Sequence, residues 1–353
     1  MIHRRANSAI AVALMLSASA CQPKPPEPPV PDRSYLLRRN AVDPTKPCLI
    51  AKFAVVPLKL FHNIAFVPVK VNDVFTYGIL DTGSDGTLLT PAMVKAAKIA
   101  PDPKQRPYRA YGMAGGFSMQ VVLADSFQIG GLKLTHPNPS GVVDFVNSNN
   151  EKVGALIGSN LIGALDWDID FTSGQMTSYE TQNCHDIDPL WETKSTGVPL
   201  TRGTDRKFTA LANLLGLNAN VTLPVEFDGG SLTAVFDTGT GQSYLTREGA
   251  HKAGITNAQL DRDPIVVLTA INGKTRKVRR HTVSEFVVGE DLQRNFPVEV
   301  AEYFNRNDQY DMILGMDWIA RHHIWLSYTT DSLYIDSGEK KPPAWRPTPK
   351  TPD

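Results

Sequence analysis

The sequence predicts a mainly all-β protein made of two homologous, barrel-like lobes, and three observations support this fold class. The phrase Asp-Thr-Gly occurs twice, at residues 81–83 and 237–239. The residues around the two phrases align without a gap for about 30 positions at a shift of 156, which indicates an internal duplication. Both copies consist of short apolar or alternating runs bounded by Gly, Asn and Asp, a pattern typical of strands and hairpins.

A second match extends the repeat and sets the expected domain boundaries. The segment ALIGSNLI at 155–162 aligns with MILGMDWI at 312–319. We therefore expect an N-terminal lobe at 48–184, a turn-rich linker at 185–195 and a C-terminal lobe at 196–338.

Two further local elements are expected within and before the lobes. The segments TPAMVKAAKI and TREGAHKAGI predict one short helix in each copy, beginning at Thr90 and Thr246, because threonine is able to cap a helix. The segment at 40–58, before the first motif, is expected either to pair as an edge strand or to cover the site as a pro-segment.

The N-terminus predicts export. Arg4 and Arg5 precede the apolar run AIAVALML, which is too short to span a membrane, so residues 1–20 are expected to be a signal peptide. The small residues that lead into Cys21 resemble a bacterial lipoprotein box, although Ala18 stands where such boxes usually carry Leu. The resemblance implies lipidation of Cys21 and anchoring in the bacterial cell envelope, facing the periplasm. The alternative is ordinary cleavage after Ala20, which would give a secreted soluble product.

Both ends of the mature chain are rich in proline. Residues 21–47 contain QPKPPEPPVPD, which favours an extended tether between the anchor and the first lobe. Residues 339–353 contain KKPPAWRPTPKTPD and are expected to form a disordered tail.

Charge and cysteine content limit the classes of partner. The chain has 36 lysines and arginines and 36 aspartates and glutamates, so it lacks the net positive charge that would favour a nucleic-acid partner. Cys48 and Cys184 flank the first copy, and an oxidising compartment permits a disulfide between them. The alternative is two isolated thiols. Two cysteines lack the repeated Cys/His spacing of a zinc site, so neither a metal nor another cofactor is expected.

The two motif aspartates are the main candidate functional residues. In each copy an apolar strand delivers an aspartate at its end, and a glycine follows where the backbone turns tightly. Asp-Thr-Gly followed by Ser or Thr, together with a later apolar-apolar-Gly strand, occurs twice and resembles the aspartic proteases. The resemblance is pepsin-like in the two-lobed connectivity and retropepsin-like in the small size of each half. It implies a β-rich fold with the active site in a cleft between two lobes.

The resemblance also implies a role for each motif residue. Asp81 and Asp237 would be catalytic, sharing one proton and activating a water that attacks the peptide carbonyl. Thr82 and Thr238 would lock the two loops together through hydroxyl and backbone hydrogen bonds. The other supporting positions are Gly83 and Gly239, at the turns, and Ser84 and Thr240, whose hydroxyls would bond the outer carboxylate oxygens. The expected partner is an extended peptide or protein substrate, and the chain is expected to be a monomer because it contains both halves.

A hairpin over the site is expected from each copy. In copy one, Tyr111, Gly112, Gly115 and Gly116 are the candidate flap residues, and the alternative for the glycines is a simple tight turn. Copy two has INGKTRKVRRH in the corresponding place, with Asn272 and Gly273 as candidates. Its crowded Lys and Arg side chains predict a solvated face or, alternatively, selection of acidic substrates or contact with anionic lipids.

An aspartic endopeptidase is therefore the first expectation from the sequence. The alternative is a catalytically silent peptide-binding or scaffold lipoprotein with the same fold. Both aspartates, both threonines and both hydroxyl residues that follow the glycines are present, so the sequence contains no sign that the catalytic set has decayed.

Overall fold

The structure is a computed structural model of the chain. It describes residues 43, 45–101, 107–112, 115–135, 138–144, 153–202, 220–228, 230–270, 273–301 and 310–341. The expected signal peptide, the lipidation site Cys21, most of the tether and the flap candidate Asn272 lie outside the described residues.

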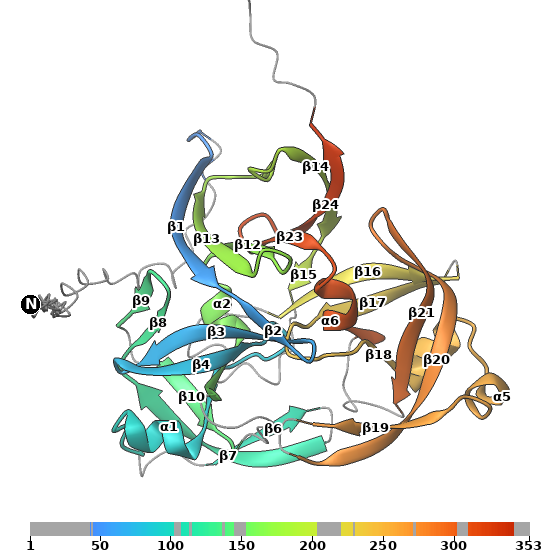
Figure 1. Cartoon of the computed structure of the whole chain (residues 1–353), viewed down its shortest axis with the longest axis horizontal. Helices are drawn as coiled ribbons and strands as arrows, with labels where there is room; N and C mark the ends of the chain where they lie inside the picture. The colour runs from blue at the N-terminus through green and yellow to red at the C-terminus, as the bar shows by residue number, and fades with distance from the viewer. Residues whose placement is uncertain are drawn as a thin grey trace, which may run out of the picture. The chain divides into compact units, whose positions relative to one another are not determined.

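The first repeat forms a ten-stranded sheet, with strand order β6-β7-β10-β5-β11-β4-β3-β8-β9 and β2 paired to β3 (Figure 1). Its strands are β2 (Lys59–Phe61), β3 (Ile64–Val71), β4 (Val74–Leu80), β5 (Leu88–Leu89), β6 (Tyr108–Gly112), β7 (Gly115–Ala124), β8 (Phe127–Ile129), β9 (Leu132–Leu134), β10 (Asn138–Val142) and β11 (Val153–Ile157).

The second repeat forms an eight-stranded sheet in the order β15-β16-β17-β22-β18-β21-β20-β19. Its strands are β15 (Thr201–Arg202), β16 (Val221–Phe227), β17 (Gly230–Phe236), β18 (Tyr244–Thr246), β19 (Ile265–Thr269), β20 (Thr275–Val288), β21 (Asp291–Ala301) and β22 (Met312–Leu314). In both sheets the strand that precedes an Asp-Thr-Gly motif pairs in parallel with the apolar strand of the second match, β4 with β11 and β17 with β22.

A third sheet takes strands from both repeats, in the order β1-β13-β12-β23-β24-β14. Its strands are β1 (Leu49–Pro57), β12 (Asp166–Asp170), β13 (Gln175–Gln182), β14 (Thr193–Pro199), β23 (His323–Ser327) and β24 (Ser332–Lys340). The repeats meet at the central pair, where β12 runs antiparallel to β23 with Trp167 opposite Leu326. The two halves therefore share a sheet that the expected lobe boundaries did not include.

This shared sheet also decides how the segments at the boundaries are used. β1 is its edge strand, so residues 49–57 follow the edge-strand alternative and not the pro-segment alternative. β14 begins at Thr193, inside the expected linker, and β24 runs to Lys340, inside the expected tail. The first two residues of the expected tail, Glu339 and Lys340, are therefore part of β24, and Lys340 pairs with Thr193 of β14.

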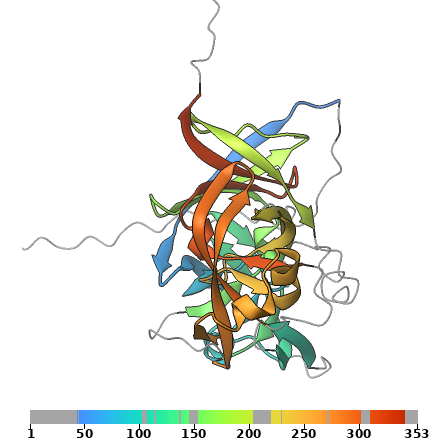
Figure 2. The same cartoon turned by 90° about the vertical axis from the view of Figure 1, so that its right-hand side faces the viewer.

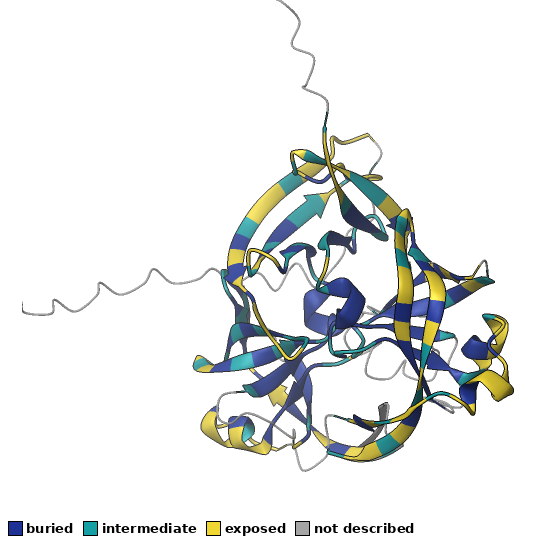
Figure 3. Ribbon diagram, turned by 45° about the vertical axis from the view of Figure 1, so that its right-hand side comes forward, coloured by how far each residue is buried: buried dark blue, intermediate teal, exposed yellow. Residues whose placement is uncertain are grey.

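The helices are short: α1 (Pro91–Ala96), α2 (Ser159–Ile162), α4 (Arg247–Lys252), α5 (Asn257–Leu260) and α6 (Met316–Ile319). The two threonine caps are confirmed, since the Thr90 hydroxyl accepts from Met93 N–H at 3.1 Å and the Thr246 hydroxyl accepts from Gly249 N–H at 2.8 Å. All residues of α2 and α6 are buried, and buried helix appears dark blue near the centre of Figure 3. Among the described residues, no helix is long and apolar enough to cross a membrane.

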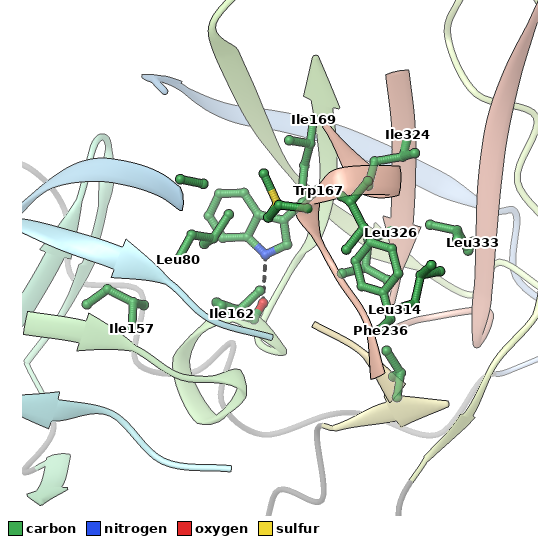
Figure 4. Close-up of a cluster of buried hydrophobic side chains, with 14 of the residues drawn as sticks. Leu80, Ile157, Ile162, Trp167, Ile169, Phe236, Leu314, Ile324, Leu326 and Leu333 are labelled. Carbon is green, nitrogen blue, oxygen red and sulfur yellow. Dashed lines mark hydrogen bonds between the residues drawn. The ribbon is translucent and has the colours of Figure 1, made fainter. Parts of the chain in front are cut away.

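One hydrophobic cluster extends through both repeats and the shared sheet. Figure 4 shows Leu80 and Ile157 from the first repeat beside Trp167 of β12, with Phe236 and Leu314 from the second repeat nearby. The Trp167 indole satisfies its single donor by bonding the carbonyl of Ile162 at 2.7 Å. Leu80 and Phe236 each precede a catalytic-motif aspartate, so burial of these two side chains anchors both strand ends in one core. The mainly β fold class is confirmed.

A disulfide joins Cys48 to Cys184, across 136 residues of sequence. It links the residue before β1 to the segment after β13, and these two strands are paired along their whole length. The first repeat is therefore closed covalently at the edge of the shared sheet.

Candidate active site

The two Asp-Thr-Gly loops are built in the same way. β4 ends at Leu80 and delivers Asp81, whose N–H donates to Ile157 O at 3.0 Å. β17 ends at Phe236 and delivers Asp237, whose N–H donates to Leu314 O at 3.0 Å. Each aspartate is thus fixed at the end of a parallel strand pair within its own repeat.

The glycine of each motif packs against the aspartate of the other. A Cβ added to Gly83 would lie 2.3 Å from Asp237 Cγ, and a Cβ added to Gly239 would lie 2.3 Å from Asp81 Cγ. Only a residue without a side chain permits this approach. The mutual packing brings the two carboxyl groups into hydrogen-bond contact.

The motif threonines hold the loops together. The Thr82 hydroxyl donates to Phe236 O at 2.7 Å and accepts from Thr238 N–H at 3.0 Å. The Thr238 hydroxyl donates to Leu80 O at 2.8 Å and accepts from Thr82 N–H at 3.1 Å. Both side chains are fully buried, so the interlocking hydrogen bonds that the resemblance implies are present and shielded from water.

The pair favours retention of one proton. Each aspartate is half-buried as a residue, but its carboxyl group lies among atoms of both repeats. Removal from water raises the pKa of Asp81 well above its usual value, and the charge of Asp237 and the hydrogen bond to it raise that pKa further. Burial also raises the pKa of Asp237, but the N–H of Gly239, 2.7 Å from its Oδ1, opposes the rise. Both carboxyl groups are therefore harder to ionise than a free aspartate, and the pair retains one shared proton.

The supporting hydroxyls differ from expectation. Ser84 Oγ donates to Gly86 O at 2.8 Å, and Thr240 Oγ1 donates to Gln242 O at 3.3 Å. A hydroxyl has one proton to donate and an ionised carboxylate only accepts, so a proton used for a carbonyl is not available to the carboxylate. The expected hydroxyl bonds to the outer carboxylate oxygens are corrected. Ser84 instead bonds Asp81 through its backbone N–H, which lowers the pKa of Asp81.

Comparison with known sequences agrees with this geometry. A sequence model of the family described as aspartyl protease matches residues 67–161 and 223–318, which include both motifs and together make up more than half of the chain. The chain belongs to the aspartyl protease family. No curated protein matches it in sequence.

Two solved structures of aspartic proteases are similar to this family member. A retropepsin-like aspartic protease from Rickettsia conorii has 19% sequence identity and a TM-score of 0.29, and the match covers 41% of this chain and 94% of that one. An aspartic proteinase from Irpex lacteus has 15% identity and a TM-score of 0.46, and the match covers 82% of this chain and 97% of that one.

The expected flap of the first repeat is a two-stranded hairpin. Tyr111 pairs with Gly116, and Gly112 pairs with Gly115, between β6 and β7. The side chain of Tyr111 lies outside the described part of the structure. In the second repeat, β19 and β20 form the corresponding hairpin, with Gly273 at φ 77° where its N–H donates to Ala270 O at 2.8 Å. The two hairpins lie side by side in the lower part of Figure 1, and Figure 2 agrees.

Two of the crowded cations on β20 are held by their own repeat. Arg280 Nη2 bonds Glu299 Oε1 at 2.6 Å, and Arg279 Nη1 donates to Asp263 O at 2.9 Å. For these two arginines the contacts favour a structural role and not the selection of acidic substrates.

Sequence reasoning missed a buried polar group in the second repeat. Tyr244 lies opposite Glu299 in the sheet, where the first repeat has Leu88 opposite Gly141. Burial and the neighbouring charge of Glu299 raise the pKa of Tyr244 well above its usual value, and its hydroxyl also bonds the Thr240 side chain. The alignment at a shift of 156 would have exposed the difference at Tyr244.

Sequence reasoning also missed a pair of equivalent side-chain hydrogen bonds, one in each repeat. The Thr87 hydroxyl bonds Asn160 Oδ1 at 2.8 Å, and the Ser243 hydroxyl bonds Asp317 Oδ1 at 2.6 Å at the equivalent place. The aligned segments ALIGSNLI and MILGMDWI contain Asn160 and Asp317 in matching positions, so the repeat itself was the available signal. Burial raises the pKa of Asp317, and the hydrogen bonds from Ser243 oppose this rise because they stabilise the ionised carboxylate.

Within the described residues, no group of three His, Cys, Asp or Glu side chains is arranged to hold a metal ion. The chemistry of the site is derived from its carboxyl pair.

Proposed function

We propose that the protein is an aspartic endopeptidase that hydrolyses a peptide bond with water activated between Asp81 and Asp237. The observation that carries the proposal is the contact between two carboxyl groups delivered by equivalent loops of two repeats, each packed on the glycine of the other. Two such carboxyls ionise together only at high cost, so one acts as a base while the other acts as an acid. Membership of the aspartyl protease family supports the same chemistry.

The N–H of Gly239 donates to Asp237 Oδ1 at 2.7 Å and favours the ionised form of Asp237, and on this contact we assign the first step. Asp237 is the base and takes a proton from the attacking water as its oxygen bonds the carbonyl carbon. Asp81 gives its proton to the carbonyl oxygen, which yields a neutral gem-diol and reverses the protonation of the pair.

The second step restores the pair. The nitrogen of the scissile bond takes the proton from Asp237, while one hydroxyl of the gem-diol returns a proton to Asp81. The C–N bond then breaks to release an amine and a carboxylic acid. No covalent bond between substrate and enzyme forms, so added hydroxylamine is expected to trap no acyl-enzyme.

Cleavage of a diverse peptide library between pH 3 and pH 8 tests the proposal. The wild-type protein is compared with Asp81→Asn and Asp237→Asn. Asp73→Asn serves as a matched control, because that carboxylate is exposed and forms a surface ion pair with Lys133. We expect cleavage by the wild type and the control, and loss in both dyad variants. Cleavage that survives in either dyad variant would refute the assignment. Peptide binding without cleavage by the wild type would favour the silent, peptide-binding alternative.

We also propose that the enzyme is exported and lipid-anchored through Cys21, and that it acts as a monomer. The N-terminal sequence supports export, and the Cys48–Cys184 disulfide is consistent with an oxidising compartment. Two catalytic loops in one chain support the monomer. Labelled fatty acid is expected to enter the wild type but not Cys21→Ser, and the mature enzyme is expected to sediment as a monomer.

A further inference from the structure

Asn220, from the second repeat, reaches the catalytic loop of the first. It directly precedes β16 and is half-buried. Its Nδ2 donates to Gly83 O at 3.2 Å, and its Oδ1 lies 2.9 Å from the Ser159 hydroxyl, whose one proton is shared with Ser84 O at 2.8 Å. Ser159 in turn donates its N–H to Ser84 O at 2.8 Å. Both ends of the Asn220 amide are thus fixed, one by the loop and one by α2.

The carbonyl that receives this bond belongs to the peptide group next to Asp81. The peptide between Gly83 and Ser84 accepts from Asn220 at its C=O and donates to the Asp81 carboxyl at its N–H. Hydrogen bonds at the two ends of one peptide group polarise each other, so a bond to the carbonyl strengthens donation by the N–H. Asn220 therefore acts on Asp81 through one peptide group.

The second repeat lacks this arrangement. Met316 takes the place of Ser159, and its N–H donates to Thr240 O at 2.8 Å, but its side chain has no hydroxyl. Asn63, which directly precedes β3, also reaches across, yet it donates to Gly241 O at 3.3 Å. Gly241 lies two residues beyond Gly239, the counterpart of Gly83. The amide support therefore acts on Asp81 and has no equivalent at Asp237 among these contacts.

We propose that Asn220 is a positioning residue for Asp81, and that it stabilises the negative charge on Asp81 when this carboxyl gives its proton to the substrate. The inference rests on the proposed function, because it assigns Asp81 the role of the acid. A donor that is already oriented toward the place where charge develops lowers the barrier without reorganisation. Ser159 contacts both the Asn220 amide and Ser84 O, so its hydroxyl supports the same loop directly and through Asn220.

The charged surroundings of Asp81 are simple enough for a pH test. The charged group that faces it is Asp237, from the opposite loop. Asp85, on the same loop, is exposed. The side chains that hold Asn220 are uncharged. Loss of the Asn220 amide weakens the Ser84 N–H bond that lowers the pKa of Asp81, so that pKa rises and the alkaline limb of the rate profile moves to higher pH.

The test compares Asn220→Ala, Ser159→Ala and Asn63→Ala in the full-length protein, with kcat, KM, thermal midpoint and the pH profile measured for each. For Asn220→Ala we expect kcat to fall about three- to tenfold with KM little changed, and the alkaline limb to move up. Ser159→Ala is expected to do the same to a smaller extent. The double variant should lose less than the product of the single losses, because both act through one chain of bonds.

Asn63→Ala is the matched control, since it also removes a cross-repeat amide bond to a loop carbonyl. It is expected to lower the thermal midpoint by at least as much, because Asn63 lies at φ 58° where alanine is strained, while kcat stays within about twofold and the pH limbs stay in place. Equal kcat losses in Asn220→Ala and Asn63→Ala, or an unmoved alkaline limb in Asn220→Ala, would overturn the proposal. If Asn220→Ala does not fold, Ser159→Ala decides by the same criteria.

A separate readout distinguishes this inference from the proposed function. If the wild type cleaves no peptide, the endopeptidase proposal fails, but the titration of Asp81 is still measurable by carbon NMR of labelled aspartate carboxyls, assigned with Asp81→Asn. A higher titration midpoint in Asn220→Ala and an unchanged one in Asn63→Ala would then support the positioning of Asp81 alone. Equal midpoints in all three proteins would refute it.

Discussion

Replacing Thr82 by valine removes a fully buried hydroxyl that joins the two repeats while almost conserving the shape of the side chain. The hydroxyl makes two short bonds, to Phe236 O at 2.7 Å and from Thr238 N–H at 3.0 Å. Valine leaves the Thr238 N–H without this acceptor in a place that water does not reach. An unsatisfied buried donor costs about 1–3 kcal/mol and each lost bond about 1 kcal/mol, so we expect a loss of about 2–4 kcal/mol in the free energy of unfolding.

The same change acts on catalysis, because each loop carries one carboxyl of the pair. A shift of about 1 Å between reacting groups lowers rates by about 100-fold, so we expect kcat of Thr82→Val to fall by about tenfold or more. Urea unfolding with an unchanged slope measures the stability loss, and initial rates on one cleaved peptide measure kcat.

Two variants make the result decisive. Thr82→Ser keeps the hydroxyl and is expected to retain most of both properties. Thr222→Val removes one hydroxyl bond, to Thr201 O at 3.2 Å, from a partly exposed strand, and is expected to cost less than about 1 kcal/mol. If Thr82→Val matched Thr222→Val in stability and activity, the interlocking hydroxyls would not hold the loops.

Three further changes follow from the same geometry. Gly83→Ala forces a Cβ against the opposite carboxyl at 2.3 Å and is expected to lower kcat about 100-fold or more, whereas Gly197→Ala, whose nearest atoms lie at 3.5 Å, is the tolerated control in the same assay. The pKa of Asp81 is higher in the folded state than in the unfolded state, so this carboxyl destabilises the fold as the pH rises from the unfolded pKa to the folded pKa. Asp81→Asn is therefore expected to melt at a higher temperature than the wild type at pH 7 and at the same temperature at pH 3. A lower melting temperature of the variant at pH 7 would contradict this. Removing the disulfide with Cys48→Ser and Cys184→Ser is expected to cost about 4–5 kcal/mol for a loop of 136 residues while kcat is kept, and an equal melting point with and without reductant in the wild type would count against it.

The parts of the fold that depend on neighbouring residues could be predicted from the sequence. Thr90 and Thr246 cap their helices because the signal is a single hydroxyl three residues before the N–H that it accepts from. The Asp-Thr-Gly loops were recognisable because the phrase and its flanking strands occur twice.

Contacts between distant parts of the chain could not be predicted in the same way. The alternation of residues in β12 and β23 indicates strands, but it does not name the partner of either, so their antiparallel pairing in one sheet was not foreseen. The Ser84 hydroxyl was assigned to another acceptor than the one observed, because the turn offers it the carbonyl of Gly86 at 2.8 Å. Asn220 belongs to no motif, and its partner Ser159 lies 61 residues away in the sequence.

Duplication allows the two sides of the dyad to differ. Two identical loops share one proton equally on average, yet at any moment one carboxyl is the acid and the other is the base. The motif residues are nearly the same in both repeats, so any lasting difference between the two aspartates comes from the residues around them. When the two repeats are aligned, Ser159 corresponds to Met316 and Asn160 corresponds to Asp317. A homodimer of one repeat has the same residues on both sides, whereas a single chain with two repeats is free to change one side. The hydrogen bond from Asn220 to only one of the two loops is one such change, and it favours the charged form that Asp81 adopts after giving up its proton.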